Sequence, residues 1–392
     1  MAENVKNTKL VHVTTVPQTL GFLRGQIGYM QDRGFEIHAI SSPGVLLQEA
    51  AQQEHISVHA VNMSRSISPV ADFMALFKLY RLFCRLKPEV VHGHTPKGGF
   101  LSILAARLSR VPYVLYSLRG LRFVTETGLR RSLLEWAEAV TCRLSKRVFS
   151  TSHSIRRTIL ETGLCPEKKI VVLGQGSSNG VDAEIRFNPL FLPPGTRAEV
   201  RKRYEVPLDS LVIAYVGRIV KDKGIVELKE AWQHLRDLFP SLYLLMVGSI
   251  EPHDPVPSHV LAQLQRDPRI RFTGMVQEMP LLYASIDILV LPTYREGFPN
   301  TPLEAAAMEL PVVATRVDGC QEAVKDGITG LLVPPRKGQA LAAAMQELLL
   351  DSEKRKQMGV AGRQRVLKNF RPEFIWELLY QQYEDLLQQH KG

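Results

Sequence analysis

Two successive series of short apolar segments, each alternating with longer amphipathic segments, constrain the fold of this chain more than any other feature. In the first series, strand-like segments rich in β-branched residues lie at 10–14, 36–40, 58–61, 90–92, 113–117, 147–150 and 170–172. Helical patterns lie between them at 18–33, 45–54, 73–86, 100–108 and 129–144. Strands that alternate with helices of this length form a parallel sheet covered by helices.

A second series follows a stretch at 179–207 in which Asn-Gly, Asn-Pro, Pro-Pro-Gly and Val-Pro indicate turns and a domain junction. Strands are predicted at 211–216, 243–247, 270–272, 288–291 and 311–314, with helices at 225–238, 258–265, 280–285 and 302–308. Beyond Pro335 only helices are expected. The last, at 372–388, carries an apolar stripe that predicts a packed helix or, alternatively, a helix on a membrane surface. The 392 residues therefore suit two domains.

The composition indicates which kinds of partner the chain can bind, but not which reaction it catalyses. A net charge of +10 favours anionic partners such as nucleotides, pyrophosphates, phospholipid headgroups or nucleic acid. The four cysteines are far apart and form no Cys-x-x-Cys pair, which predicts free thiols in a reducing compartment. The N-terminal residues lack the pattern of a signal peptide, and apolar runs are too short to span a bilayer. We expect a cytoplasmic protein whose contact with the inner membrane face is at most peripheral.

The segment 286–308 places two carboxylates around one helix N-terminus, because it runs from a strand through a Gly- and Pro-containing loop into a helix. Glu296 lies on the loop and Glu304 in the first turns of the helix. Backbone N–H groups around Asn300 and Thr301 suit a phosphate, and a carboxylate one turn further on can accept hydrogen bonds from a ribose diol. A capped helix with two solvated glutamates is the alternative.

The spacing of Glu296 and Glu304 resembles the E-x7-E signature of retaining glycosyltransferases of the GT-B fold, glycosyltransferase family 4. The segment 214–224, Ala-Tyr-Val-Gly-Arg-Ile-Val-Lys-Asp-Lys-Gly, also resembles the strand-to-helix donor loop of this family. The resemblance covers nearly the whole chain. It implies an α/β protein with two doubly wound parallel-sheet, Rossmann-like domains facing a central cleft. Residues 1–190 would bind the acceptor, 191–370 the nucleotide sugar, and the helix at 371–392 would return to the N-terminal domain.

Residue by residue, the same resemblance assigns the donor site. Arg218 and Lys223 would hold the donor diphosphate, although salt bridging is an alternative role for both. Glu304 would bind the ribose, and Glu296 would position the hydroxyls of the transferred sugar rather than act as a nucleophile. The remaining donor contacts would come from Asn300, Thr301, Gly297, Phe298 and, near the base, Val276.

Three further segments of the N-terminal half follow predicted strands. In His92-Gly-His94-Thr-Pro-Lys97, His94 could contact donor or acceptor as a catalytic residue, or both histidines could be structural. No third ligand is evident for a metal, so we predict none. Gly21 corresponds partly to the glycine-rich loop of the family, but a plain turn is as good a reading. Arg119 stands where many relatives have His; it cannot act as a neutral base but can contact a phosphate or sugar oxygen.

The predicted function is retaining transfer from a nucleoside-diphosphate sugar, most simply a UDP-sugar, to a hydroxyl of a glycan or polyprenyl-pyrophosphate-linked acceptor. The nearest subgroup is that of bacterial surface polysaccharides and lipid-linked oligosaccharides. No Asp-x-Asp pair occurs, so we expect no metal and no cofactor. Alternatives are a sugar-nucleotide epimerase of the same fold and a non-catalytic anion- or membrane-binding protein; no nucleic-acid motif is present. The candidate membrane surface is the basic stretch 119–131 with Leu121 and Phe123.

Overall fold

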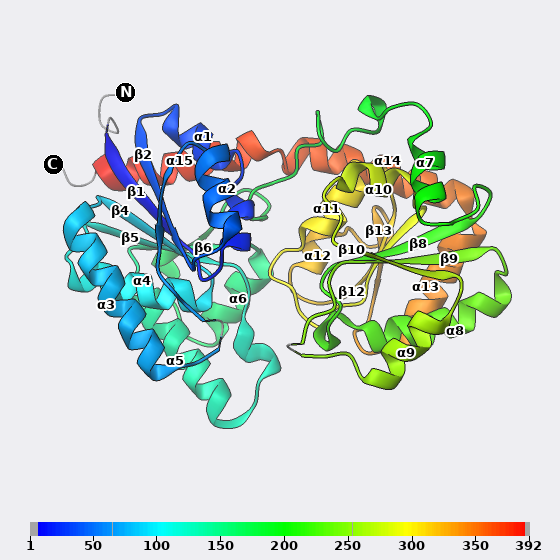
Figure 1. Cartoon of the computed structure of the whole chain (residues 1–392), viewed down its shortest axis with the longest axis horizontal. Coiled ribbons are helices and arrows are strands. Elements are labelled where there is room, and N and C mark those ends of the chain that lie inside the picture. The colour runs from blue at the N-terminus through cyan, green and yellow to red at the C-terminus, as the bar shows by residue number, and fades with distance from the viewer. Residues whose placement is uncertain (1–6, 65, 253, 389–392) are drawn as a thin grey trace. The chain divides into compact units, whose positions relative to one another are not determined.

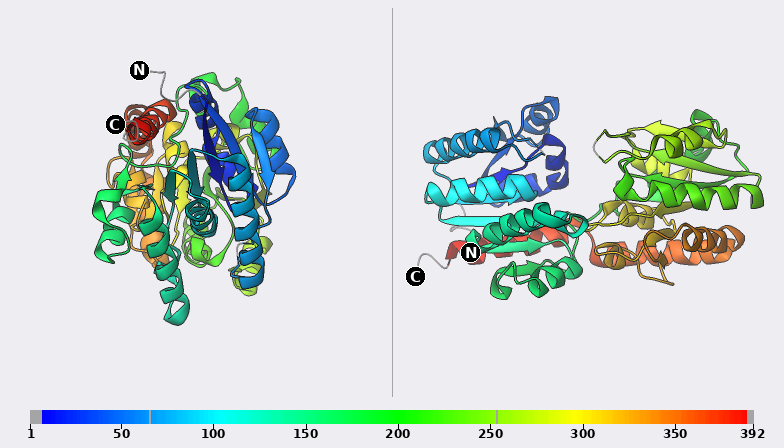
Figure 2. Two further views of the ribbon diagram at one scale, coloured as in Figure 1. Left: turned by 90° about the vertical axis from the view of Figure 1, so that its left-hand side faces the viewer. Right: turned by 90° about the horizontal axis from the view of Figure 1, so that it is seen from below.

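The computed structural model describes residues 7–64, 66–252 and 254–388. The chain divides into two compact units (Figure 1). Unit 1 comprises the chain up to Asn179 together with the C-terminal segment from Pro372, and unit 2 comprises Gly180–Arg371. Each unit is a parallel sheet with helices against both faces (Figure 2).

Unit 1 is built on a seven-stranded sheet in the order β3-β2-β1-β4-β5-β6-β7. Every neighbouring pair in this sheet is parallel. The strands are β1 (Thr8–Val13), β2 (Phe35–Ser41), β3 (Ser57–Ala60), β4 (Val90–His94), β5 (Tyr113–Leu118), β6 (Arg147–Ser150) and β7 (Ile170–Val172). The order reverses direction at β1, because right-handed crossovers place the helices of the two halves on opposite faces.

The helices of unit 1 accordingly form two layers. Against one face pack α1 (Gln26–Gln31), α2 (Val45–Gln53) and the C-terminal helix α15 (Pro372–Gln388), which buries Leu379, Tyr383 and Leu386. Against the other pack α3 (Pro69–Leu86), α4 (Pro96–Leu108), α5 (Gly128–Leu144) and α6 (His153–Glu161). Short 3-10 turns η2 (Pro17–Leu23), η3 (Arg122–Thr125) and η4 (Glu167–Lys169) connect them.

Unit 2 has a six-stranded parallel sheet in the order β10-β9-β8-β11-β12-β13 around one apolar core. Its strands are β8 (Leu211–Val216), β9 (Leu242–Val247), β10 (Ile270–Gly274), β11 (Ile288–Leu291), β12 (Val312–Thr315) and β13 (Gly330–Val333). Its helices are α7 (Thr196–Arg203), α8 (Ile225–Leu238), α9 (Ser258–Arg266), α10 (Met279–Ala284), α11 (Asn300–Ala307), α12 (Cys320–Ala323), α13 (Gly338–Leu350) and α14 (Ser352–Asn369). The 3-10 turns are η5 (Pro189–Phe191) and η6 (Lys221–Lys223).

The two doubly wound parallel sheets confirm the predicted fold class, while three local expectations were wrong. The helix expected at 18–33 is broken into η2 and α1, because Gly25 adopts a φ of 75° and a Cβ there would lie 2.6 Å from the Trp376 ring. Strand β13 lies before Pro335 and was not predicted. Leu121 and Phe123, expected on a membrane surface, are buried in the core of unit 1.

No helix in the described part of the chain combines the length and the apolar character needed to cross a membrane. The four cysteines form no disulfide in the structure.

Candidate active site

Two loops at the carboxyl edge of the unit 2 sheet interlock. One follows β8 and contains η6, and the other follows β11. The backbone N–H of Tyr294 donates to the carbonyl of Asp222 at 2.8 Å, and Arg295 forms an ion pair with the Asp222 carboxylate at 3.0 Å. Gly224 has a φ of 72°, and a Cβ there would lie 1.9 Å from the carbonyl oxygen of Pro292. Only glycine permits this approach of the two loops.

This interlocking brings Lys223 and Glu296 together as a salt bridge. Their side chains are 15% and 16% exposed, respectively. A charge pair shielded from water to this degree is stronger than one on an open surface. Two of the residues predicted for the donor site, from segments more than seventy positions apart, are therefore direct neighbours.

Arg218, the second cation predicted for the diphosphate, is paired differently. Its Nη1 forms an ion pair with Glu251 at 3.0 Å, on the loop after β9. Its carbonyl accepts a hydrogen bond from the Tyr215 hydroxyl at 2.6 Å, which fixes the backbone of the loop. Both cations are thus paired with a carboxylate. Glu251 was not predicted as a site residue, because nothing in the local sequence indicates its pairing.

The N-terminus of α11 follows the loop after β11, and its first residue has a hydrogen-bond acceptor that is unpaired within the described part of the chain. Asn300 is the first residue of the helix, and its Oδ1 is buried without a hydrogen-bond partner among the described residues. Thr301 beside it is partly buried. Phe298 packs on Phe370 at a ring separation of 5.6 Å, and Gly319 meets the carbonyl of Gly297 so closely that an added Cβ would lie 2.3 Å from it. These contacts hold the turn that presents the helix N-terminus.

Glu304 lies one turn into α11 and accepts a hydrogen bond from the Tyr283 hydroxyl at 3.0 Å. Burial raises the pKa of this carboxyl, while the Tyr283 hydrogen bond and the charge of Arg186 act in the opposite direction. Tyr283 comes from α10 and Arg186 from the segment before η5, and no local sequence pattern indicates either residue. Val276, beyond β10, is partly buried against the unit 2 core.

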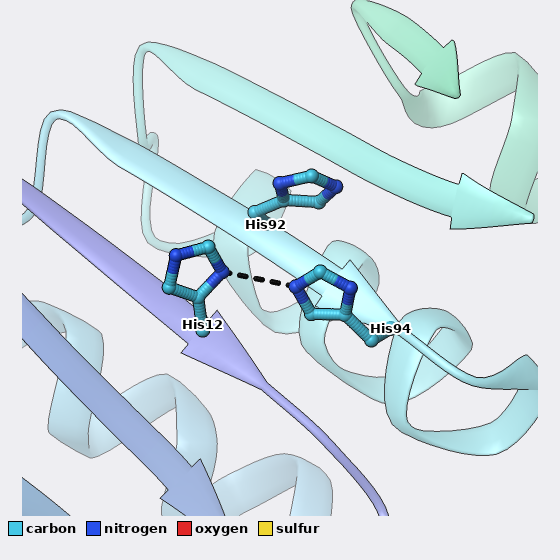
Figure 3. Close-up of side chains that lie close together, drawn as sticks. All are labelled: His12, His92 and His94. Atoms are coloured by element: carbon cyan, nitrogen blue, oxygen red, sulfur yellow. Dashed lines mark hydrogen bonds between the residues drawn. The ribbon is translucent and has the colours of Figure 1, made fainter. Parts of the chain in front are cut away.

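In unit 1 a cluster of three buried imidazoles spans strands β1 and β4. Parallel pairing places His12 opposite His92, and His12 Nδ1 lies 2.9 Å from His94 Nε2 (Figure 3). The two nitrogens of His92 contact the Tyr383 hydroxyl at 2.7 Å and the Ser117 hydroxyl at 2.8 Å. His92 and His94 thus lie within a strand under α15, rather than on the loop that the sequence suggested.

Arg119 fixes the direction of the hydrogen bonds in this cluster. Its Nη2 lies 3.3 Å from His94 Nδ1, and a guanidinium can only donate. His94 Nε2 therefore carries the proton and donates to His12 Nδ1, which leaves the proton of His12 on Nε2. That atom, and Nε and Nη1 of Arg119, are buried with no partner among the described residues.

The imidazoles are neutral because of this environment. Burial, and next the charge of Arg119, lower the pKa of His12 to about 3. Burial likewise lowers the pKa of His92 and His94 well below 6.5, with the neighbouring rings and Arg119 adding to it. Burial lowers the pKa of Arg119 to about 10, so the guanidinium stays charged at pH 7.

The cluster revises the sequence argument about a metal, which found no third ligand. One nitrogen from each of His12, His92 and His94 lies within 4.8 Å of the others. In the directed chain, however, the Nδ1 lone pairs of His94 and His12 already accept hydrogen bonds, and a cation would face Arg119. The arrangement instead favours a chain of hydrogen-bond donors. At its ends, His12 Nε2 and the Nε and Nη1 of Arg119 can donate to an oxygen atom of a ligand.

A pocket of about 200 Å³ opens at the same edge of the unit 1 sheet. Its polar lining consists of the hydroxyls of Thr15, Thr19 and Thr95 with Lys97 and Arg122. Thr15 accepts from the backbone N–H of Gly98 at 2.9 Å, and Lys97 pairs with Asp72 at 2.6 Å. Gly21 lies in η2 with open space where a Cβ would be, so no contact in unit 1 requires glycine there.

Comparison with known proteins identifies the family. A model described as "Glycosyl transferases group 1" matches residues 196–365, and one described as "Glycosyl transferase 4-like domain" matches residues 22–176. The capsular polysaccharide biosynthesis glycosyltransferase CapM of Staphylococcus aureus is 33% identical over 388 residues, which cover 99% of this chain and 100% of CapM. The chain belongs to the group 1 glycosyl transferases. It is thus an enzyme of glycosyltransferase family 4, as its motifs predicted.

Two further proteins extend the comparison. The UDP-Gal:alpha-D-GlcNAc-diphosphoundecaprenol alpha-1,3-galactosyltransferase of Escherichia coli is 25% identical to this glycosyltransferase over 334 residues, covering 83% of this chain and 84% of its own. The crystal structure of Anabaena HepE in complex with UDP-glucose matches with a TM-score of 0.80 and 18% identity, over 97% of this chain and 100% of HepE. The latter likeness confirms the GT-B fold and no more.

Proposed function

We propose that the enzyme transfers a sugar, with retention of anomeric configuration, from a UDP-sugar to a hydroxyl of a glycan or a polyprenyl-pyrophosphate-linked saccharide. The observation that carries this proposal is the salt bridge of Lys223 and Glu296 beside the N-terminus of α11. The names of two relatives support the substrates, since one acts in capsular polysaccharide biosynthesis and the other uses UDP-galactose and a diphosphoundecaprenol acceptor.

On the donor side, the diphosphate would take the place of a carboxylate at each cation. Lys223 would exchange Glu296, and Arg218 would exchange Glu251, for phosphate oxygens. Backbone N–H groups of Asn300 and Thr301 would bind the same phosphates at the helix N-terminus, and Gly297 and Phe298 would shape the turn. These positive groups would stabilise the charge that develops on the departing diphosphate.

The two glutamates would then have separate roles. Glu296, released from Lys223, would accept hydrogen bonds from hydroxyls of the transferred sugar. Glu304 would accept them from the ribose, with Tyr283 holding the carboxylate in place, and Val276 would lie near the base. The acceptor hydroxyl would attack the oxocarbenium-like sugar on the face that the diphosphate leaves, and its proton would pass to the departing phosphate oxygen.

On the acceptor side, unit 1 would supply Arg119 and the threonine-lined pocket. Arg119, held by His94, would bind a phosphate or sugar oxygen through Nε or Nη1. The threonine-lined pocket with Lys97 would accept sugar hydroxyls or an acceptor phosphate. Gly21 lies on the same edge and would approach the donor pyrophosphate.

The test compares Lys223→Met and Glu296→Gln with matched controls. Lys221→Met lies two positions from Lys223 on the same turn and is exposed, and Glu278→Gln changes an exposed glutamate of unit 2. We expect a loss of transfer of about 100-fold or more in the first two variants, with native circular dichroism and near-native activity in the controls. Full activity in either site variant would remove the assignment.

The donor and the outcome need their own measurements. A panel of nucleotides screened by thermal shift would identify the base, and mass spectrometry with proton NMR of the product would give the sugar and the anomer. An inverted product would contradict retention. Incubation with donor alone separates transfer from epimerisation, because an epimerase would produce an isomer without acceptor.

Metal independence and location complete the proposal. We propose that transfer needs no metal or other cofactor, since Lys223, Arg218 and a helix N-terminus provide the positive charge at the diphosphate. Unchanged activity in excess chelator is expected, and a requirement for Mg²⁺ or Mn²⁺ would contradict it.

We propose that the enzyme acts in the cytoplasm, in peripheral contact with the membrane that carries its acceptor.

A further inference from the structure

The outer face of α3 is apolar, although the helix already packs on the sheet with its opposite face. Ala75, Leu79 and Leu82 are buried beneath it. On the other side, large apolar side chains recur every three or four positions and are exposed, Phe73 to 71%; they are Val70, Phe73, Met74, Phe77 and Tyr80. A helix that is apolar on both faces normally has a partner on both.

A second exposed stripe lies on α5. Leu129 is 92% exposed and Trp136 is 57% exposed, with Leu133 between them on the same face. The helix α4 lies between α3 and α5 on this side of the sheet, and its Phe100 contacts the Trp136 ring at a centroid separation of 5.9 Å. We call the exposed apolar side chains of both helices the apolar patch; they are Val70, Phe73, Met74, Phe77, Tyr80, Leu129, Leu133 and Trp136.

The charges around the patch are mainly basic. Lys78, Arg81 and Arg85 are exposed on α3, and none forms an ion pair within the residues that the structure describes. Arg81 lies 5.9 Å from the ring centre of Phe77, inside the patch. On α5, by contrast, Arg130 pairs with Glu126 at 3.2 Å and Arg131 with Glu135 at 2.8 Å, so the unpaired cations of the patch are those of α3. Exposed aromatic side chains interleaved with unpaired cations are complementary to a surface of anionic lipid headgroups over acyl chains.

The patch also reaches the edge of unit 1 that holds the threonine-lined pocket. The N-termini of α3 and α4 are tied together there, because Lys97 at the start of α4 pairs with Asp72 in the first turn of α3 at 2.6 Å. Lys97 also donates to the carbonyl of Ser66 just before α3. The patch residues nearest this end are Val70 and Phe73. A surface seated on the patch therefore passes close to the pocket opening.

We propose that the apolar patch docks unit 1 on an anionic lipid surface, so that the pocket at Thr15, Thr95 and Lys97 faces an acceptor embedded in that surface. Of the stretch 119–131, the docking site includes Leu129 but not Leu121 and Phe123, which are buried. This inference rests on the proposed function only for the acceptor. The docking itself depends on the patch alone.

The test is flotation of the full chain with vesicles of phosphatidylglycerol and phosphatidylcholine, compared with phosphatidylcholine alone. Lys78→Glu, Arg81→Glu and Arg85→Glu together should weaken binding to anionic vesicles about 100-fold or more, since each basic residue near such a surface contributes about 1 kcal/mol. The matched control makes the same charge change on unit 2, with Lys202→Glu, Lys356→Glu and Lys368→Glu, all exposed in the native chain. That control should bind as the native enzyme does.

A second pair of variants tests the apolar part. Phe73→Ser with Phe77→Ser should abolish flotation at 0.5 M salt, where screening leaves mainly apolar contacts. Leu190→Ser with Phe191→Ser, exposed on η5 of unit 2, is the control and should not change it. Native binding in the patch variants, or no binding of the native enzyme to anionic vesicles, would overturn the proposal. A dimer of the native enzyme in solution that is lost only in the patch variants would also overturn the proposal.

Activity separates this proposal from the function on which it draws. Transfer to a water-soluble acceptor should be native in Phe73→Ser with Phe77→Ser, whereas transfer to an acceptor in anionic vesicles should fall in proportion to binding. Patch-dependent flotation without any transfer would leave the docking intact and refute the proposed reaction. Native transfer to vesicle acceptors by the patch variants would refute the docking and leave the proposed reaction intact.

Discussion

Glu138 offers a quantitative test of how burial sets the energetics of unit 1. It lies on the inner side of α5, is 6% exposed and has Oε1 without a hydrogen-bond partner among the described residues. The Tyr116 hydroxyl favours the ionised form of this carboxyl and so acts to lower its pKa. Burial outweighs that contact and raises the pKa of Glu138 from 4.5 to about 7. No cation of the described residues forms an ion pair with this carboxylate.

The sign and size of the effect follow from linkage. An acid whose pKa is higher in the folded state stabilises the fold below its unfolded pKa, and this stability is lost as the pH rises toward the folded value. With one pKa unit equal to 1.36 kcal/mol, ionisation of Glu138 lowers the free energy of unfolding by about 2.5 kcal/mol between pH 5 and pH 8. Glu138→Gln cannot ionise and should lack this component.

The assay is urea denaturation of native enzyme and Glu138→Gln at pH 5 and pH 8, followed by circular dichroism. The double difference is required because the buried histidines of unit 1 change stability in the opposite direction over part of this range. Glu161→Gln, an exposed glutamate of unit 1, is the control and should leave the native pH dependence unchanged. A variant that keeps the whole native difference between pH 5 and pH 8 would refute the reasoning.

Three further expectations follow from the structure. Glu304→Gln should weaken UDP binding about 10- to 150-fold in calorimetry, since a hydrogen bond to a charged group contributes about 1.5–3 kcal/mol; unchanged affinity would contradict the ribose assignment. Gly99→Ala should lower the free energy of unfolding by about 1–3 kcal/mol in urea, because its Cβ would lie 2.4 Å from the Tyr116 ring. His12→Gln should lessen the loss of stability as the pH falls from 6.5 toward 3, because the native imidazole has a lowered pKa and resists protonation in the fold. An acid titration identical to that of the native enzyme would count against the last.

The sheets could be predicted because their strands and helices are encoded locally. Strands β8 and β11 and helix α8 coincide with the predicted segments, since a buried parallel strand is a continuous apolar run and a packed helix has a 3.6-residue period. The break between η2 and α1 could not be predicted, because it depends on Trp376, which comes from the far end of the chain. Strand β13 begins with Gly330 and is followed directly by Pro334 and Pro335, so turn-forming residues enclose its three apolar positions.

The candidate site divides in the same way. Motif spacing pointed to Lys223 and Glu296, whose proximity depends on two loops that each follow a predicted strand. His12 escaped notice because only the register of β1 against β4 places it opposite His92. Leu121 and Phe123 were assigned wrongly, because a basic, partly apolar stretch has the same sequence pattern whether its apolar side chains face lipid or the core. Partners such as Tyr283 reach the site through packing, which no local pattern records.

The cations of the two units have different partners, so ligand binding would have a different consequence in each unit. In unit 2 Lys223 is already satisfied by Glu296, so a diphosphate must compete with a shielded carboxylate, and its arrival would release Glu296 toward the sugar. In unit 1 no carboxylate of the described residues pairs with Arg119, and its Nε and Nη1 have no hydrogen-bond partner among those residues. Under the proposed function, nucleotide binding is an exchange of partners, whereas binding at Arg119 satisfies a buried cation for the first time. The donor site would therefore be selective for a strong diphosphate anion, whereas Arg119 would bind any correctly placed oxygen ligand.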